Sequence, residues 1–482
     1  MNWRALDPLD SAFITLEVPS TPLHIGAIIE LETNDDLTPN ERFEMIRANI
    51  ASRIHEIPSL TKRVIRAPLD LAWPVLADDP DFDVSEHVIR RALPAPGDTD
   101  QLNALVGRVM AQELLPDRPL WEFNVIEGLE GGHIAIVMKV HHALADGVSG
   151  ALTFAGLFDI TPDVREPAPA STEPVGALPT SLDMLGHTAI DLLKRPGALL
   201  DVVAAGLSRV ADVLDKVAGT VQGKGDEFAG VALPNVLEAA RTSLNGTPSH
   251  SKVFTRLQTP LADAKRAAKT RGATVTDFIM ACCSGALKRL LDERGETLTK
   301  DLIAFVPINV RRQGAEAEMG NQFSAMLSGL RTDLDDREER IAALAQASKK
   351  QGSINREHNA ALLMNLASAV GPTVTSFAGR ALSDMGLFDV LPPIANVTVS
   401  SVPGPPIPLY LSGYLVTSAA PLGPLMAGLA LNITVLGYVD SLEWGILACS
   451  RHVPDIEKLR TYIQEEADYY LSTPAPRELD PK

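Results

Sequence analysis

The sequence is poor in cysteine and has no excess of basic residues. Only three cysteines occur among 482 residues, and two of them, Cys282 and Cys283, are adjacent. This usage excludes a disulfide framework and predicts a reducing, intracellular setting. The 43 lysines and arginines are outnumbered by 61 aspartates and glutamates, which leaves a formal net charge of -18. Because a nucleic-acid-binding surface has to be basic, this balance predicts no nucleic-acid partner.

The sequence also predicts no segment that would carry the chain into or across a membrane. No window reaches about 18 uninterrupted apolar residues, so no membrane-spanning helix is predicted. The first seven residues, MNWRALD, contain no charged region followed by an apolar one, so no signal peptide is predicted. We therefore expect a cytoplasmic protein. Peripheral contact with the inner membrane or with lipid droplets stays open, because local patches can override net charge.

What the chain does contain is enough apolar sequence for packed cores, at 45% hydrophobic residues. Segments with strand and helix patterns alternate on both sides of a stretch rich in proline and alanine that follows residue 160. This order predicts a mixed α/β fold in which 1–160 and 249–482 are domains and 161–248 is a linker with a helical connector. Strands are expected at 25–31, 121–127, 133–140, 302–307, 396–400, 429–438 and 442–449, and helices at 39–54, 99–112, 148–157, 276–291 and 456–471.

The connector contains a second informative pattern. Between residues 199 and 221, leucine and valine recur at steps of three and four, which is typical of an amphipathic helix. One interpretation is that this apolar stripe packs on the globular body. The other is that it contacts a membrane or a lipid droplet. The polar face is not strongly basic, which weakens the second interpretation.

The most informative motif is HHxxxDG, which runs from His141 to Gly147 directly after the apolar run 134–140. A strand that ends in two histidines and a sharp turn places imidazoles at a sheet terminus. Neutral imidazole, with an unperturbed pKa of about 6.5, is the usual protein base near neutral pH. It can take the proton of an alcohol as the oxygen attacks an activated acyl group such as a thioester. The tetrahedral oxyanion would then need one or two hydrogen-bond donors nearby.

Each position of the motif has an expected role. Adjacent residues on a strand point to opposite faces, so one imidazole can face the reaction while the other packs into supporting structure. Asp146 is interpreted as a structural cap or arginine partner, and Gly147 as a turn residue. One alternative is a metal site, but no His or Cys cluster completes a ligand set, so no metal is expected. Another is a buried, hydrogen-bonded histidine pair.

Two basic groups are candidates for contact with the phosphates of an acyl carrier such as coenzyme A. One is the run 265–271, which begins with Lys265 and Arg266, and the other is Arg311, at the end of a predicted strand. The alternative for the run is a solvated helix face. Cys282 and Cys283 lie in an apolar helical pattern, which predicts core packing rather than a thiol nucleophile. The remaining histidines, His24 among them, are isolated and receive no role.

Further short elements follow in a fixed order along the chain, at 6–13 (LDPLDSAF), 21–26 (TPLHIG), 119–121 (PLW), 306–311 (VPINVR), 320–324 (GNQFS), 402–405 (VPGP) and 431–435 (LNITV). Together with HHxxxDG they make the chain resemble, nearly from end to end, the bacterial wax ester synthase/acyl-CoA:diacylglycerol acyltransferase family. HHxxxDG alone is shared by a wider superfamily that includes peptide condensation domains and chloramphenicol acetyltransferase.

The resemblance implies two chloramphenicol-acetyltransferase-like domains with an active-site tunnel at their interface. His142, the second histidine of the motif, would be the general base, with His141 in support. The acyl group would pass directly from acyl-CoA to diacylglycerol, or to a long-chain alcohol, with no covalent intermediate and no cofactor. Two alternatives stay open. One is acyl transfer to another hydroxyl or an amine, and the other is a non-catalytic relative that binds lipid droplets.

Two positions depart from the family's pattern. Thr276-Asp277 stands where the family often has Asn-Asp, and Ser401 stands where it has the asparagine of Ser-Asn-Val-Pro-Gly-Pro. Both changes replace an amide with a hydroxyl, which can still donate one hydrogen bond at shorter reach. Thr276, Asp277 and Ser401 are therefore candidates for binding the oxyanion or shaping the site.

Overall fold

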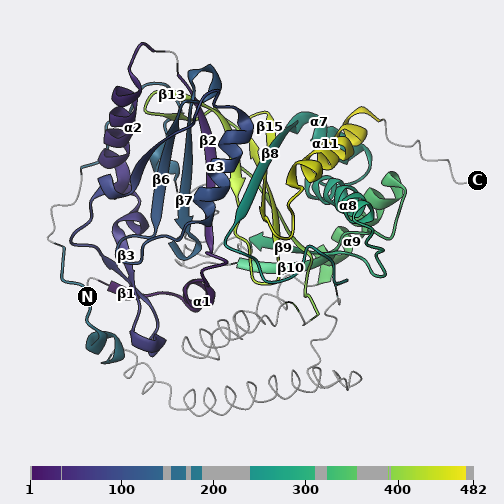
Figure 1. Cartoon of the computed structure of the whole chain (residues 1–482), viewed down its shortest axis with the longest axis horizontal. Coiled ribbons are helices and arrows are strands. Elements are labelled where there is room, and N and C mark those ends of the chain that lie inside the picture. The colour runs from purple at the N-terminus through teal and green to yellow at the C-terminus, as the bar shows by residue number, and fades with distance from the viewer. Residues whose placement is uncertain are drawn as a thin grey trace, which may run out of the picture.

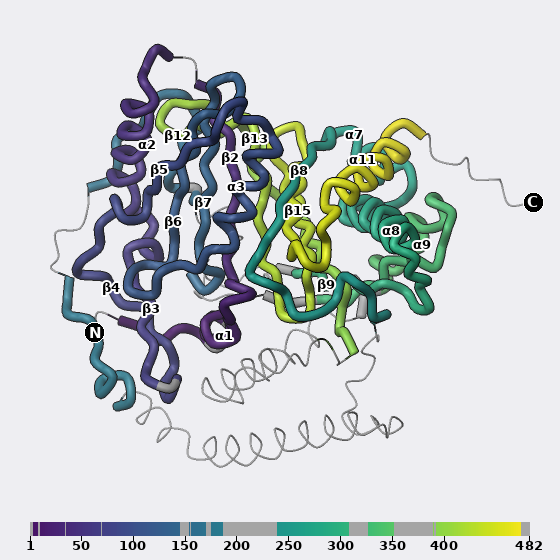
Figure 2. The backbone as a smooth tube through the Cα atoms, viewed as in Figure 1, coloured from purple at the N-terminus to yellow at the C-terminus, as the bar shows by residue number. Residues whose placement is uncertain are grey.

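A computed structural model gives the fold and describes residues 3–33, 35–144, 154–169, 175–186, 239–309, 323–354, 389 and 392–473. In this part of the chain the molecule has two halves side by side, each built on a six-stranded sheet (Figure 1). The smooth trace in Figure 2 shows where the same two halves meet. β8 (Lys252–Pro260) and β15 (Ser441–Cys449) lie on one side, and α3 (Thr99–Ala111) and β2 (His24–Glu32) lie on the other.

The sheet of the first half has the strand order β12-β13-β2-β7-β6-β5. Its strands are β2 (His24–Glu32), β5 (Val88–Ala92), β6 (Trp121–Glu127), β7 (Ile134–His141), β12 (Tyr410–Leu411) and β13 (Tyr414–Leu422). The central strand β7 is buried along its whole length. Its alternate residues enter two different cores, because Ile136 and Val140 pack in one apolar cluster while Ala135 and Val137 pack in another. A strand buried on both faces is apolar along most of its length, as this one is between Ile134 and Val140 except at Lys139.

The second half has a mixed sheet with helices packed on it. Its strand order is β10-β9-β11-β14-β15-β8. These strands are β8 (Lys252–Pro260), β9 (Ile303–Asn309), β10 (Phe323–Gly329), β11 (Val397–Val402), β14 (Leu431–Tyr438) and β15 (Ser441–Cys449). Figure 1 shows α7 (Leu261–Thr270), α8 (Val275–Glu293), α9 (Arg337–Ile354) and α11 (Ile456–Ser472) grouped beside this sheet. Their apolar faces and the sheet form the largest core cluster of the described residues, which includes the fully buried Trp444.

One segment of the second half crosses into the first. β13 pairs antiparallel with β2, with Ala420 opposite Ile28, and β12 pairs with β13. β13 also crosses β15, where the backbone of Pro421 lies so close to Gly445 that a Cβ on this glycine would be 1.7 Å from the carbonyl oxygen. The domain boundaries expected at 160 and 249 do not account for this crossing, because β12 and β13 belong to 249–482 but join the sheet of the first half. Pairing between distant segments leaves no local pattern in the sequence.

Smaller elements complete the first half. They are β1 (Trp3–Ala5), β3 (Lys62–Ile65) and β4 (Val75–Asp78), which form a three-stranded sheet, and α1 (Pro8–Leu16), α2 (Pro39–Arg53) and α3 (Thr99–Ala111). α2 and α3 each begin with a capping box, in which the side chains of the N-cap and N3 residues bond each other's backbone N–H. α3 packs against β8 of the other half, and Gly107 permits the close approach to the backbone of Lys252.

Candidate active site

His142 lies at the point where β7 leaves the sheet. It begins η6 (His142–Leu144), a short 3-10 turn whose Ala143 and Leu144 are buried in the same core as Val140. The backbone N–H of His142 donates to the carbonyl oxygen of Leu23, at 2.9 Å, just before β2 begins. The expected placement of the motif at a strand end is confirmed. Asp146 and Gly147 lie outside the described residues.

The imidazole of His142 is covered on one face by Phe13 of α1. The two rings stack with their centroids 4.0 Å apart and an angle of 24° between their planes. The residue is half-buried. Burial, and secondly the charge of His141, lowers the pKa of His142 from 6.5 to about 4. The ring is therefore neutral at pH 7, which is the protonation state that a general base requires.

His141 has a different environment. It is the last residue of β7, its side chain is 1% exposed, and its Nδ1 accepts a hydrogen bond from the backbone N–H of Ala143 at 3.1 Å. A neutral ring in this position carries its hydrogen on Nε2. That nitrogen lies 3.5 Å from Oε2 of Glu17. With its lone pair occupied and its ring buried, His141 is arranged for support rather than for proton transfer.

Three residues near the motif were not identified from the sequence: Phe13, Glu17 and His24. His24 is directly opposite His141 in the β2–β7 register, with the two rings 6.1 Å apart, edge to face. Its Nε2 lies 3.6 Å from Oε1 of Glu17. Burial, then the charges of Lys139 and His141, holds the pKa of His24 well below its usual value. The sequence signals were the elements 6–13, which ends in Phe13, and 21–26, which contains His24. Neither indicates these contacts, because strand register and packing between distant segments are not visible along the chain.

The oxyanion candidates lie in two places. Ser401 is half-buried near the end of β11, opposite Val435 of β14, and its neighbour Val402 packs against the core that contains Ala143. This strand end therefore reaches the half of the molecule that carries His142.

Thr276 and Asp277 begin α8 instead. Thr276 is exposed, whereas Asp277 is buried with its carboxylate accepting hydrogen bonds from the backbone N–H and the hydroxyl of Thr274, both at 2.8 Å. Helix capping accounts for the Asp277 carboxylate. A part in oxyanion binding stays a prediction for Thr276, Asp277 and Ser401.

The basic candidates are solvent-facing where they are described. Lys265 and Arg266 are exposed on α7, and Arg266 pairs with Asp263 at 2.7 Å one turn earlier. Arg271, at the end of the same run, is instead buried in an ion pair with Glu338. Contact of Lys265 and Arg266 with CoA phosphates stays a prediction. Arg311 lies outside the described residues, and so does the amphipathic stretch 199–221.

Other sequence predictions concern the cysteines, a metal site and membrane-spanning helices. Cys282 and Cys283 are fully buried in α8, and burial raises the pKa of both thiols, that of Cys283 to about 12. The prediction of core packing is confirmed. Within the described ranges, no three His, Cys, Asp or Glu side chains are grouped to hold a metal ion. No helix described there has the length and apolarity to cross a membrane.

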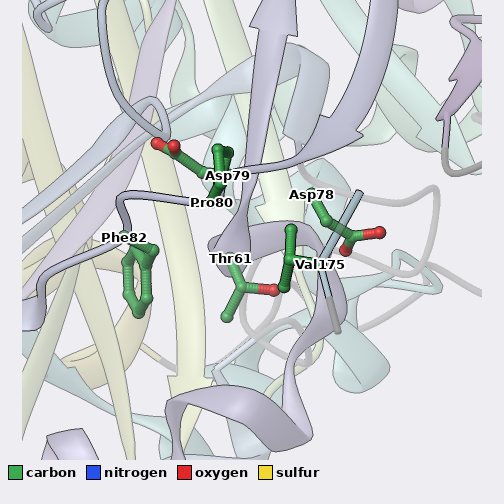
Figure 3. Close-up of a pocket in the computed structure, with 6 residues that line it drawn as sticks. All are labelled: Thr61, Asp78, Asp79, Pro80, Phe82 and Val175. Atoms are coloured by element: carbon green, nitrogen blue, oxygen red, sulfur yellow. The ribbon is translucent and has the colours of Figure 1, made fainter. Parts of the chain in front are cut away.

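A surface pocket of about 290 Å³ opens elsewhere, at the end of β4. It is lined by Thr61, Asp78, Asp79, Pro80, Phe82 and Val175, which Figure 3 shows as sticks. None of the candidate site residues is among them, and two of the six are acidic. This pocket therefore has neither the base nor the cationic groups that transfer from an acyl carrier requires.

Comparison with known proteins identifies the family. The model of the wax ester synthase/diacylglycerol acyltransferase catalytic domain matches residues 6–279, and that of the family's C-terminal domain matches residues 319–469. A Mycobacterium tuberculosis protein named as a diacylglycerol O-acyltransferase is 30% identical over 94% of this chain and 88% of its own length. A second protein of that organism and name is 31% identical, over 95% of this chain and 97% of its own length.

Solved structures confirm the expected fold of two chloramphenicol-acetyltransferase-like domains. The wax ester synthase/diacylglycerol acyltransferase from Marinobacter aquaeolei VT8 superposes with a TM-score of 0.68 at 23% identity, covering 97% of this chain and all of that one (100%). The first condensation domain of the CDA synthetase gives 0.53 at 18% identity, covering 98% and 97%. Since both domain models match and the relatives align over most of their length, the chain belongs to the wax ester synthase/diacylglycerol acyltransferase family of acyltransferases.

Proposed function

We propose that this protein transfers a long-chain acyl group from acyl-CoA to the hydroxyl of diacylglycerol, and also to long-chain alcohols, with His142 as the general base. The observation that carries the proposal is the burial of His142 against Phe13, which keeps the imidazole neutral and able to accept a proton. Membership of the family and the names of the mycobacterial relatives support this substrate class.

In the proposed reaction, His142 takes the proton of the acceptor hydroxyl as its oxygen attacks the thioester carbonyl. The oxyanion of the tetrahedral intermediate then collapses, the C–S bond breaks, and the imidazolium returns its proton to the departing CoA sulfur. The thioester is already activated, so the reaction needs no cofactor and no covalent enzyme intermediate. Of the proposed oxyanion donors, Ser401 has the better support, because Val402 beside it packs on the core next to His142.

The remaining parts of the proposal concern binding. Acyl-CoA and the acceptor would reach His142 through a tunnel between the halves 1–160 and 249–482, to which 161–248 is the connector. Lys265, Arg266 and Arg311 are the proposed contacts for CoA phosphates, and the exposure of the first two leaves them accessible. Asp146 and Gly147 would shape the turn after the base.

Peripheral contact with a membrane or lipid droplet would be made by the stripe 199–221. Its test is flotation of the purified protein with triolein droplets coated with phospholipid. Replacing Leu207 and Leu214 by glutamate should remove binding, and retained binding would contradict a role for the stripe.

The test of the reaction is product analysis. Purified protein receives labelled palmitoyl-CoA with diacylglycerol and hexadecanol in competition, and the neutral lipids are separated. We expect labelled triacylglycerol, with wax ester as the second product, and at least about a hundredfold less of both from His142→Ala. Undiminished turnover by this variant would overturn the proposed base. Label in neither lipid, with transfer to an amine or another hydroxyl, would overturn the proposed acceptor.

A further inference from the structure

A cluster of three ionisable side chains lies beside the proposed base: two buried imidazoles and a carboxylate whose side chain is 27% exposed. Glu17 follows α1, His24 begins β2 and His141 ends β7. Both histidines are 1% exposed. The two carboxylate oxygens of Glu17 each lie near a different imidazole, Oε1 at 3.6 Å from Nε2 of His24 and Oε2 at 3.5 Å from Nε2 of His141. These separations are longer than a hydrogen bond, so the contacts in this state are electrostatic.

The carboxylate of Glu17 is held in place by the loop that follows it. The backbone N–H of Leu23 donates to Oε1 of Glu17 at 3.2 Å, and the carbonyl of the same Leu23 accepts from the backbone N–H of His142 at 2.9 Å. Lys252, from β8 of the other half, donates to the carbonyl oxygens of Ser20 and Ser249 and so anchors the loop. Glu17 and His142 are therefore both hydrogen-bonded to the backbone of Leu23.

The chemistry of His141 connects the cluster to the turn that carries the base. Because Nδ1 accepts from Ala143, the ring hydrogen belongs on Nε2, which faces Oε2 of Glu17. This buried nitrogen has no hydrogen-bond partner within the described part of the chain. With the other tautomer, an N–H on Nδ1 would oppose the N–H of Ala143, and the turn would lose that bond. A carboxylate beside an imidazole N–H is a common means of fixing one tautomer.

We propose that Glu17, with His24, is a positioning element for His142: the carboxylate fixes His141 as its Nε2–H tautomer, and His141 then holds the turn on which the base stands. The Leu23 N–H that Oε1 accepts, together with the buried ring of His24 beside the same oxygen, keeps the carboxylate from rotating away. None of these groups is proposed to touch a substrate. The inference rests on the proposed function, since it assigns a purpose only if His142 is the base.

The kinetic test compares substitutions that keep or remove the hydrogen-bond-accepting oxygen at position 17. Glu17→Ala should lower kcat by about a hundredfold, the loss that a displacement of about 1 Å at a catalytic group can cause. Glu17→Gln keeps an acceptor oxygen and should lose about tenfold or less. The KM values for acyl-CoA and diacylglycerol should stay within about twofold, because Glu17 contacts neither substrate. His24→Leu should behave like Glu17→Gln, and His24→Gln, which keeps a donor, should recover part of the loss. Glu32→Gln makes the same substitution at the other end of β2 from His24. It is the matched control, and its kcat should equal that of wild type.

A second readout separates positioning from folding. With ¹⁵N-labelled histidine, NMR of the wild type should show the His141 signal, assigned by its loss in His141→Gln, with hydrogen on Nε2 alone. In Glu17→Ala and His24→Leu the same signal should show a mixture of tautomers, while the unfolding temperature stays near that of wild type. If Glu17→Ala does not fold, Glu17→Gln and His24→Leu provide the test.

Three results would overturn the positioning role of Glu17 and His24. A wild-type kcat in Glu17→Ala and His24→Leu, with His142→Ala inactive, overturns the positioning role and leaves the proposed base intact. An unchanged His141 tautomer in Glu17→Ala also overturns it. Full activity of His142→Ala removes the proposed base and the positioning role with it.

Discussion

The pKa of His142 gives a prediction about activity in mild acid. Burial of the ring, one face of which Phe13 covers, and secondly the charge of His141 lower this pKa from 6.5 to about 4. The shift corresponds to about 3.4 kcal/mol at 1.36 kcal/mol per pH unit. At pH 5.0 about nine-tenths of such a base is neutral, against about 3% for an imidazole with the unperturbed pKa. We expect kcat/KM for acyl-CoA to change by less than twofold between pH 7.5 and pH 5.0.

Replacing Phe13 by alanine should admit water to the covered face of the ring and raise its pKa toward 6.5. A rise to about 5.2 would leave about four-tenths of the base neutral at pH 5.0. The ratio of kcat/KM at pH 5.0 to that at pH 7.5 should then fall from about 0.9 to about 0.4 or lower. Phe13→Leu keeps an apolar cover and is the control, with a ratio near that of wild type. Using a ratio removes any pH-independent effect on substrate binding.

Stability has to be followed in the same samples. Between pH 6.5 and pH 4, His142 of the unfolded chain binds a proton that the folded protein does not, so folding stability falls as the pH falls. At pH 5.0 this linkage costs about 2 kcal/mol relative to neutral pH. Unfolding curves at both pH values show whether each variant stays folded. A wild-type kcat/KM that drops more than about tenfold by pH 5.0, with the protein folded, would refute the argument from burial.

Three further predictions concern other residues. Ser401→Ala should lower kcat by less than His142→Ala does, although an oxyanion donor can contribute about two to three orders of magnitude; an equal or larger loss in steady-state assays would contradict this order. Lys265→Ala with Arg266→Ala should raise KM for acyl-CoA several-fold with kcat unchanged, and an unchanged KM would leave the run as a solvated helix face. Asp159→Ala should destabilise the fold by about 3–5 kcal/mol in urea unfolding, because it leaves the fully buried Arg53, paired with Asp159 at 2.9 Å, without its carboxylate. A cost below about 1 kcal/mol would show that water reaches this pair.

Much of the secondary structure could be predicted because buried residues recur with the period of their element. The strand expected at 121–127 is β6 (Trp121–Glu127), and the helix expected at 276–291 is α8 (Val275–Glu293). β12 and β13 are among the strands that were not predicted, as are β8 and β10. β12 has two residues, and β13 contains Pro421 and a run of small side chains, which weakens an alternating pattern.

The candidate site was predictable in part for a similar reason. A local motif places His142 at the end of a buried strand, and the structure confirms this placement. The surroundings of the motif come from distant segments. Phe13 reaches the ring from α1, and His24 meets His141 through the β2–β7 register. Neither contact follows from spacing along the chain, so the sequence indicates the proposed base but not the groups that surround it.

The central claim is that His142 removes the proton of the acceptor hydroxyl during acyl transfer from acyl-CoA. The most direct measurement is the rate of labelled triacylglycerol formation by purified wild type and His142→Ala, with circular dichroism and unfolding temperature compared between them. We predict product from the wild type, a loss of at least about a hundredfold in the variant, and the same fold in both. A folded His142→Ala protein that makes triacylglycerol at the wild-type rate would contradict the account.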